Sequence, residues 1–374
     1  MQPGDGGDDQ EETAGDAKST APRFGALTRR GALLGMGVVA GVAAVDVGGF
    51  AYAGGWLRPD ELTPPRFADR FEAVYGRHDG FRRNHAKGLS ATGTFESNGA
   101  GEAICRAAVF RSGTVSLIGR FSLGGGLPDQ PDKPDTVRGL GLLFQVPGGQ
   151  QWRTAMVNLP VFTDSTPQGF YDRMLASKPV AATGKPDPQK MAAFLDRHPE
   201  TVAAMKIIKQ TPPAAGFADS TFRGLNAFRF TNRAGATVPV RWSAVPQPGN
   251  FPAPSKGKDY LFDDVIRAVA QRPLKWQLIL TIGEPGDPTN DATKPWPQSR
   301  RTIDAGTITI AAVQTEEAGN ARDINFDPLV LPDGMTTSDD PIPAARSAVY
   351  ARSFTRRAEE PKSPSEVNVA KVLS

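Results

Sequence analysis

The sequence predicts an α+β fold in which helices surround an antiparallel β-sheet or barrel. Short strand-like segments follow one another from residue 88 onward, and turns that contain glycine or proline separate them. Helical patterns come next in the chain, and strand-like segments return after residue 220. Strands and helices therefore do not alternate regularly, as they would around a parallel sheet.

The first half of this pattern begins with a helix over residues 64–78, where a Pro-Pro pair starts the segment. Its apolar residues recur at helical spacing and share one face: Phe67, Phe71, Val74 and Tyr75. Five strand-like segments follow: 89–97, 103–111, 114–122, 137–146 and 152–162. Two helical segments come after them: 167–178 and 187–210.

The second half returns to strands and ends in a helix. Its strand-like segments are 221–232, 237–246, 275–284 and 306–313. Two more helices are expected over residues 259–272 and 343–353. The Pro- and Asp-rich stretches 286–300 and 327–343 are expected to be long ordered loops, and no internal repeat is present.

The distribution of charged residues differs between the start of the chain and the rest. With 43 basic and 40 acidic residues, the chain has no excess of positive charge that would indicate a nucleic-acid partner. Residues 1–20 contain one basic residue, Lys18, and no large apolar residue after Met1. A segment that cannot bury apolar surface does not order itself, so residues 1–28 are expected to be a disordered acidic leader.

Residues 29–53 have the features of an export signal. They begin with the pair Arg29 and Arg30, continue through small apolar residues and end in Ala-Tyr-Ala. The pattern resembles a twin-arginine signal, so we expect the twin-arginine translocase to export the chain to the periplasm. The alternative, an uncleaved membrane anchor, is less favoured because the run is short and contains Asp46. Residues 54–374 are expected to form one domain.

The single cysteine and the three histidines differ in how strongly they indicate a functional site. With only Cys105, the chain has no internal disulfide framework, and we interpret Cys105 as a buried apolar residue in a strand. His78 and His198 lie at the ends of helical segments among charged residues, which indicates a structural or surface role. His85 lies in the sequence RRNHAKG, and its polar companions in later segments make it the candidate for chemistry.

Arg346 and Tyr350 are four residues apart in an expected helix, so they share a face. A guanidinium held beside the phenolic oxygen favours phenolate over phenol. One established use of tyrosinate is as the axial ligand of a haem iron.

Four motifs, HAKG, RFS, VNLPVF and RSAVY, occur in the order and at about the spacings of the haem-dependent catalase superfamily. The chain resembles most its small catalase-related peroxidase branch, in which RRNHAKG is usual. The resemblance covers residues 64–357 and includes FRGLNAFRFTNRAG and NFDPLVLPDGM. It implies a catalase-like antiparallel β-barrel with surrounding helices, a single haem domain over residues 54–374, and haem b as the cofactor.

The resemblance also assigns roles to individual residues. His85 resembles the distal histidine above the haem, Asn158 the distal asparagine, and Ser122 the hydroxyl that orients the imidazole. Tyr350 resembles the proximal iron ligand, and Arg346 the arginine that keeps it ionised. Three further arginines resemble those that pair with the haem propionates: Arg82, Arg120 and Arg357. Taken singly, Asn158, Ser122, Arg120, Arg357 and Tyr350 are more readily interpreted as ordinary turn, surface or core residues. Their combination in this order favours the assigned roles.

The sequence departs from large catalases beside the distal histidine. Large catalases usually carry a branched apolar residue there, whereas this chain has Asn84, whose amide could compete for the imidazole. The proximal stretch RSAVYAR lacks the Phe before and the Asp after the tyrosine of large catalases. Because little sequence follows Tyr350, we expect no counterpart of the C-terminal region that binds a nicotinamide cofactor in some of them.

The resemblance implies a haem peroxidase that reduces hydrogen peroxide or small organic hydroperoxides with an organic electron donor, with weak catalase activity. Two alternatives share the motifs: a fatty-acid hydroperoxide isomerase that forms allene oxides, and a haem-binding protein without catalysis. The expected partners are peroxide, an electron donor and the translocase, with self-association into a homo-oligomer left open.

Overall fold

The computed structural model describes residues 62–249 and 253–374. The predicted acidic leader, 1–28, and the predicted signal segment, 29–53, lie outside the described residues. The part of the chain from Leu62 to Ser374 is one compact unit. No helix in the described part of this unit has both the length and the apolar character needed to cross a bilayer.

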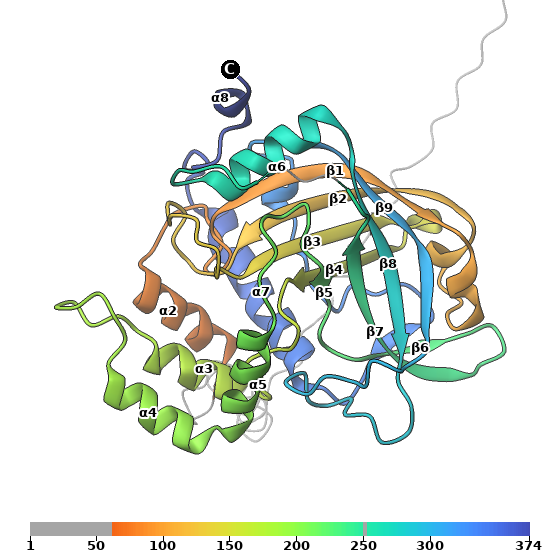
Figure 1. Cartoon of the computed structure of the whole chain (residues 1–374), viewed down its shortest axis with the longest axis horizontal. Helices are drawn as coiled ribbons and strands as arrows, with labels where there is room; N and C mark the ends of the chain where they lie inside the picture. Colours follow the sequence, from red (N-terminus) through yellow and green to blue (C-terminus); the bar gives the residue numbers. More distant parts are fainter. Residues whose placement is uncertain (1–61, 250–252) are drawn as a thin grey trace, which may run out of the picture. The chain divides into compact units, whose positions relative to one another are not determined.

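An antiparallel β-barrel forms the centre of this unit, which confirms the predicted α+β class (Figure 1). Among the described residues, eight strands pair in the ring β7-β5-β4-β3-β2-β1-β9-β8, and the pairing of β8 with β7 closes it. Two short strands, β6 and β10, extend the sheet from β7. The bounds of the strands are β1 Gly88–Ser97, β2 Gly113–Leu123, β3 Arg138–Gln145, β4 Gln151–Val157, β5 Phe222–Arg223, β6 Phe228–Thr231, β7 Thr237–Pro246, β8 Leu274–Ile282, β9 Thr302–Gln314 and β10 Met335–Thr337.

Alternate residues of the strands point into the barrel and fill it. On β2, β3 and β4 the buried inward set is Phe121, Leu140, Leu142, Phe144, Trp152 and Met156. The rings of Phe144 and Trp152 stack with their centroids 4.7 Å apart. The interior of the barrel is therefore a packed core. The outward-facing residues of the same strands are the ones that remain available to line a site.

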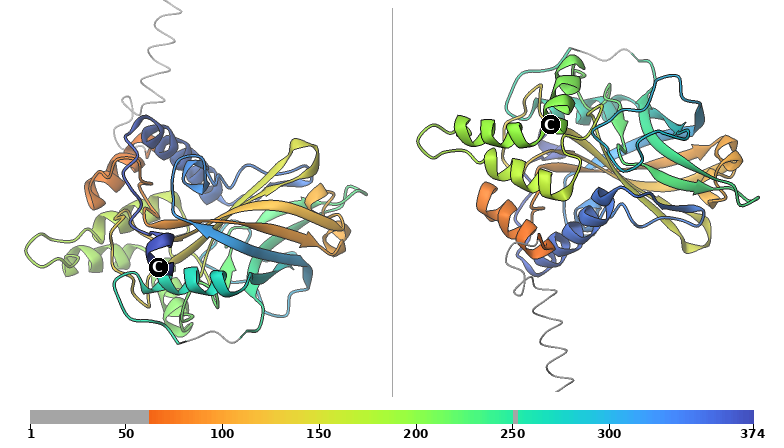
Figure 2. Two further views of the ribbon diagram at one scale, coloured as in Figure 1. Left: turned by 90° about the horizontal axis from the view of Figure 1, so that it is seen from above. Right: turned by 90° about the horizontal axis from the view of Figure 1, so that it is seen from below.

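Helices cover that outer face. Figure 2 shows α2 and α7 beside the barrel and the group α3 to α5 next to them. Phe67 and Phe71 of α2 pack with Met174 of α3 and Val349 of α7, while α6 packs against the barrel. The bounds of the helices are α2 Pro64–Tyr75, α3 Pro167–Ala176, α4 Pro188–Arg197, α5 Pro199–Gln210, α6 Tyr260–Gln271, α7 Pro341–Glu359 and α8 Val369–Leu373.

The structure corrects three of the predicted elements. Residues 103–111 form no strand: Cys105 is buried, as predicted, but lies between two short 3₁₀ helices. The expected helix 187–210 is two helices separated at His198, because Pro199 disfavours the helical conformation of the residue before it. The expected strand 221–232 is broken by Leu225, which has a left-handed φ of 59°.

Candidate active site

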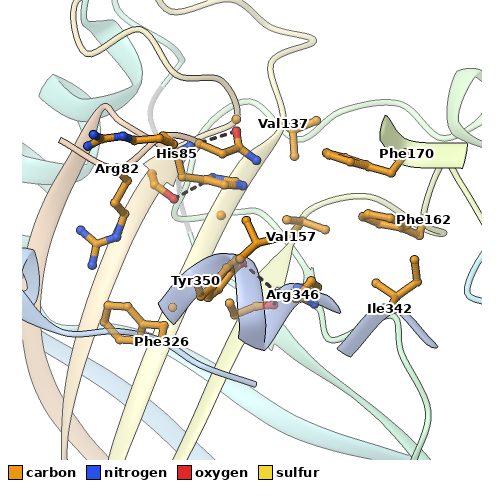
Figure 3. A pocket seen from close by; sticks show the side chains of 18 of the residues that line it. Arg82, His85, Val137, Val157, Phe162, Phe170, Phe326, Ile342, Arg346 and Tyr350 are labelled. Atoms are coloured by element: carbon orange, nitrogen blue, oxygen red, sulfur yellow. Dashed lines mark hydrogen bonds between the residues drawn. The ribbon is translucent and has the colours of Figure 1, made fainter. Parts of the chain in front are cut away.

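A cavity of about 380 Å³ lies on the outer face of the barrel, between β2 to β4 and the helices α2, α3 and α7 (Figure 3). Its size is within the usual range for small-molecule and cofactor sites. Strand alternation determines which side chains reach it, because the inward neighbours belong to the packed core. The outward residues that line it are Arg120, Ser122, Gly139, Gly141, Ala155 and Val157.

Two glycines on β3 keep one wall of the cavity flat. A Cβ atom on Gly139 would lie 2.7 Å from the Ser122 Oγ and 3.2 Å from the His85 ring. A Cβ atom on Gly141 would lie 3.0 Å from the Phe326 ring. Side chains at these two positions would fill the space between His85 and Phe326, so the glycines preserve a slot against the sheet.

His85 is held in a strained turn by three contacts of its own and by one contact of its neighbour Asn84. Its φ of 57° is left-handed, which is uncommon for a residue other than glycine. The Asn84 Oδ1 accepts hydrogen bonds from the His85 N–H, at 3.0 Å, and from the Gly125 N–H, at 2.9 Å. Arg120 donates to the His85 carbonyl oxygen at 2.8 Å, and the Ser122 Oγ lies 3.1 Å from the His85 Nδ1. The imidazole is therefore fixed through both its backbone and its ring.

The surroundings of His85 keep its imidazole neutral. The side chain is partly buried, and its ring lines the cavity. Burial, followed by the nearby guanidinium groups of Arg120, Arg346 and Arg82, lowers the pKa of His85 to about 3. At neutral pH the ring can accept a proton.

Tyr350 lies on the other side of the cavity from His85, below it in the view of Figure 3. Arg346, one turn earlier on α7, donates to the Tyr350 Oη at 3.3 Å. The same guanidinium donates to the Asn226 Oδ1 and to the Ala155 carbonyl oxygen, both at 3.0 Å. Asn226 in turn donates to Asp340, the residue that caps the start of α7. Arg346 is thus oriented by the sheet as well as by its own helix.

Arg82, Arg120 and Arg357 all line the cavity, and with Glu316 they form a charged cluster at its edge. Arg82 donates to the Ala321 and Ile324 carbonyl oxygens, at 3.1 and 2.6 Å. Burial, followed by the repulsion of the other two arginines, holds the pKa of Arg82 well below its ordinary value. Burial, followed by Arg120, lowers the pKa of Arg357 to about 10. Anionic groups placed here would relieve this repulsion.

Glu316 already supplies one buried anion. Arg120 donates to its two carboxylate oxygens at 2.6 and 2.8 Å, in a bidentate ion pair. Burial alone would raise the pKa of Glu316, but the charges of Arg120 and Arg82 hold it below the ordinary value. The resemblance paired Arg120 with a haem propionate, whereas the structure gives Arg120 a protein carboxylate as its partner.

Asn158, the predicted distal asparagine, lies between two residues that line the cavity, Val157 and Leu159, and its role stays a prediction. Asn158 is not among the residues that line the cavity, and its Oδ1 accepts a hydrogen bond from the Arg138 N–H at 2.8 Å. Ala155 and Val157 occupy the outward positions of β4, and the strand ends at Val157, so its alternation does not extend to Asn158. Figure 3 shows Val157 between His85 and Tyr350.

The structure also corrects the expectation for Asn84 and adds residues that the sequence did not single out. The Asn84 oxygen binds two backbone N–H groups, so it does not compete for the imidazole. Glu316, Asn226 and Phe326 join the site from loops, where no local periodicity marks them. Val157 could have been identified from the sequence, because it lies two residues after Ala155 and therefore faces the same side of the strand.

Comparison with known proteins agrees with this geometry. The family model described as Catalase matches residues 80–372. The chain belongs to the catalase family. A catalase-related peroxidase of Synechococcus elongatus is 36% identical over 322 residues, which are 85% of this chain and 92% of the relative. A catalase-related peroxidase of Mycolicibacterium paratuberculosis is 30% identical over 302 residues, which are 79% of this chain and 95% of the relative.

Solved catalases share the fold of this family member. Catalase A from Saccharomyces cerevisiae superposes with a TM-score of 0.67 at 20% identity, over 75% of this chain. A bacterial catalase superposes with a TM-score of 0.66 at 21% identity, over 79% of this chain. The matched part spans 62% and 61% of those two longer chains, respectively.

Membership of the catalase family implies a haem cofactor, and the residues of the cavity fit one. The flat slot at Gly139 and Gly141 suits a planar group, since a Cβ atom at either position would obstruct it. Tyr350 presents a phenolic oxygen, which is a known haem ligand. Arg82 and Arg357 provide guanidinium groups for carboxylates.

Proposed function

We propose that this protein is a haem-dependent peroxidase, which reduces hydrogen peroxide or small organic hydroperoxides with an organic electron donor. The cofactor we infer is haem b, held without a covalent link. One observation carries the proposal: a neutral, rigidly held imidazole, His85, lies across the cavity from a tyrosine that has an arginine at its oxygen.

His85 is the group that moves the proton. Peroxide must lose a proton from one oxygen and gain a proton on the other before the bond between them breaks, and one imidazole can do both. Because Ser122 engages the Nδ1 of the ring, the Nε2 is the nitrogen left to act on peroxide. The contacts to Asn84 and Arg120 keep this nitrogen in place, so little reorganisation is needed.

Tyr350 and the arginines hold the cofactor. Tyr350 would ligate the iron through its phenolic oxygen, and Arg346 places positive charge 3.3 Å from that atom. Arg82 and Arg357 would bind the haem carboxylates, while Arg120 contributes charge from its pair with Glu316. When bound, the haem supplies the redox centre that exchanges electrons with peroxide and with the donor.

Donor oxidation by the purified haem-loaded protein tests the proposal. Hydrogen peroxide with a phenolic donor should give donor oxidation well above the oxygen released from peroxide alone. Fast oxygen release with negligible donor oxidation would identify a true catalase instead. A spectrum that does not respond to peroxide would indicate a haem-binding protein without catalysis.

A fatty-acid hydroperoxide as substrate distinguishes the proposed peroxidase from the remaining alternative, the allene-oxide-forming isomerase. A peroxidase yields the corresponding alcohol and consumes the donor in proportion. An isomerase converts the same substrate into an allene oxide with no donor consumed, and this result would contradict the proposed function. Product analysis by mass spectrometry, with and without donor, distinguishes the two outcomes.

We further propose that the protein works after export to the periplasm. The proposal is based on the Arg29–Arg30 pair, the small apolar run and the Ala-Tyr-Ala sequence in residues 29–53. The twin-arginine route carries folded proteins, which suits a chain that binds its cofactor before export.

A further inference from the structure

A row of paired residues crosses the cavity wall from β2 to β5. Ser122 of β2 pairs with Gly139 of β3, and Gly139 pairs with Val157 of β4. Val157 in turn pairs with Arg223 of β5. Residues that pair directly on neighbouring strands face the same side of a sheet, and all four line the cavity. Three steps of about 4.8 Å between strands place Arg223 roughly 14 Å from Ser122 at the level of the backbone.

Arg223 is a partly buried cation without an anionic partner among the described residues. Its guanidinium makes one long hydrogen bond there, at 3.4 Å, to the Thr221 carbonyl oxygen. Burial lowers the pKa of Arg223, and no nearby carboxylate offsets this effect. Two other arginines of the cavity wall differ in this respect, because Arg120 pairs with Glu316 and Arg173 pairs with Asp164. An anionic ligand would therefore supply what Arg223 lacks.

The carboxylates of the cofactor do not account for Arg223. Haem b carries both of its carboxylates on one edge, and Arg82 and Arg357 are available to bind them. These two arginines lie close enough to Arg120 of β2 for their charges to repel one another. Two strands, β3 and β4, separate β2 from the β5 position of Arg223. Arg223 is thus left for a second anion.

The cavity is apolar on the side away from the arginine cluster. In the view of Figure 3, Phe162, Phe170 and Ile342 lie on the side of Val157 that is away from Arg82. The rings of Phe162 and Phe170 stack with their centroids 6.0 Å apart. A single cation in a cavity with aromatic and aliphatic walls suits a small ligand with an aromatic body and one carboxylate.

We propose that Arg223 binds the carboxylate of the electron donor, a phenol that carries one negative charge; this inference rests on the proposed peroxidase function. Peroxide must lie within hydrogen-bond reach of His85, whereas Arg223 is at the other end of the row from the serine that contacts this histidine. A donor needs only to reach the cofactor. Two donor molecules each lose one electron and the phenolic proton, and these convert one hydrogen peroxide into two water molecules.

Two substitutions and two ligands isolate the charge. Arg223→Gln removes the positive charge, and Arg223→Lys keeps it. Neither change leaves a described carboxylate unpaired, so the free energy of unfolding in urea should stay close to that of the unsubstituted protein. Arg229→Gln is the matched control, because Arg229 is exposed on β6 and does not line the cavity. The ligands are 4-hydroxyphenylacetate and its uncharged amide, which contain the same phenol.

Calorimetric titration of the haem-loaded protein measures binding without turnover. The dissociation constant for 4-hydroxyphenylacetate should rise about tenfold or more in Arg223→Gln, because a charge-assisted hydrogen bond is lost. The rise should be smaller in Arg223→Lys, which keeps the charge. It should stay within about twofold in Arg229→Gln, and the amide should bind all four proteins equally.

Turnover should follow the same pattern. With hydrogen peroxide, Arg223→Gln should lower kcat/KM for 4-hydroxyphenylacetate about tenfold and leave kcat/KM for the amide unchanged. The stopped-flow rate of the haem-loaded protein with hydrogen peroxide alone should also be unchanged, because His85 and its contacts are intact.

Several results would overturn the inference. One is an unchanged dissociation constant for 4-hydroxyphenylacetate in Arg223→Gln, and another is an equal loss for the amide, which would indicate a change of shape rather than of charge. A loss confined to a fatty-acid hydroperoxide, and absent for its methyl ester, would assign Arg223 to the peroxide substrate instead. If the unsubstituted protein oxidises neither phenol, the proposed function and the donor role both fail, and the titration alone decides whether Arg223 is an anion site.

Discussion

Arg346 lies one helical turn before Tyr350 on α7, and its Nη2 is 3.3 Å from the phenolic oxygen. The same guanidinium is tied to Asn226 and to the Ala155 carbonyl oxygen of β4. The pair therefore connects a helix to the barrel at the point where the cofactor is expected. A lysine could not make these three contacts together, because it lacks the planar fork of guanidinium donors.

Tyr350→Phe should lose most of the haem or change its absorption spectrum strongly, because the phenyl ring has no oxygen to ligate iron. The measurement is haem content and spectrum after reconstitution with equal amounts of protein. Tyr260→Phe is the control, since Tyr260 is not among the residues that line the cavity. A Tyr350→Phe protein with the original spectrum would contradict the assignment.

His85→Ala should slow the reaction with peroxide by about 10²–10⁴-fold while haem remains bound, because the proton-transfer group is lost.

In the unsubstituted protein the rate of the same reaction should stay flat from about pH 8 to about pH 5 and fall toward pH 3, where the imidazole becomes protonated. Stopped-flow absorption measures both. A rate that falls near the ordinary histidine pKa would show that the imidazole is not shielded as the structure indicates.

The stability of the protein should depend on pH through the same residue. The pKa of His85 is about 3 in the folded state and near 6.5 in the unfolded state, so the unfolded chain binds the extra proton first. The free energy of unfolding should therefore fall as pH drops from about 6.5 toward 3, by a few kcal/mol from this group. In urea titrations, His85→Gln should lose less stability over that range than the unsubstituted protein.

Glu316→Gln should destabilise the haem-free protein by up to about 3 kcal/mol, because it leaves Arg120 buried without its anion. The loss should be smaller in the haem-loaded protein, where cofactor carboxylates add negative charge to the cluster. Denaturant titrations of both forms measure the difference. Glu317→Gln provides an exposed control, and equal losses in both forms would argue against carboxylates of the cofactor near these arginines.

Gly141→Ala should lower haem affinity, because the added methyl group would lie 3.0 Å from the Phe326 ring inside the slot. Gly216→Ala is a matched control: its methyl group would meet only the Asp219 Oδ1, at 3.8 Å. Haem titration of both proteins gives the affinities. Equal affinities in the two variants would show that the slot is not where the cofactor binds.

Replacement of Arg29 and Arg30 by lysines should block export, because the twin-arginine signal requires the guanidinium pair. Fractionation of cells that express the full chain measures this. Haem content and activity of the retained protein should be unchanged and serve as the control. Normal export of the double variant would contradict the proposed route.

The fold could be predicted because its signals are local. The two-residue alternation of β2 to β4 and the helical spacing of α2 and α7 are visible in the sequence and are confirmed. The break at His198–Pro199 was also visible, because proline restricts the residue before it. The break at Leu225 was not, since a left-handed leucine is held by its surroundings rather than by its own preference.

The sequence by itself determined the spacing of Arg346 and Tyr350, because a helix places residues four apart on one face wherever it lies. Only the tertiary structure decided that Val157 and Asn84 border the cavity while Asn158 does not, and that Arg120 pairs with Glu316. The contact of Arg120 with Glu316 joins distant parts of the chain, and it arises because β1 pairs with both β2 and β9. Such pairings depend on the register of strands far apart in the sequence, and no local pattern specifies them.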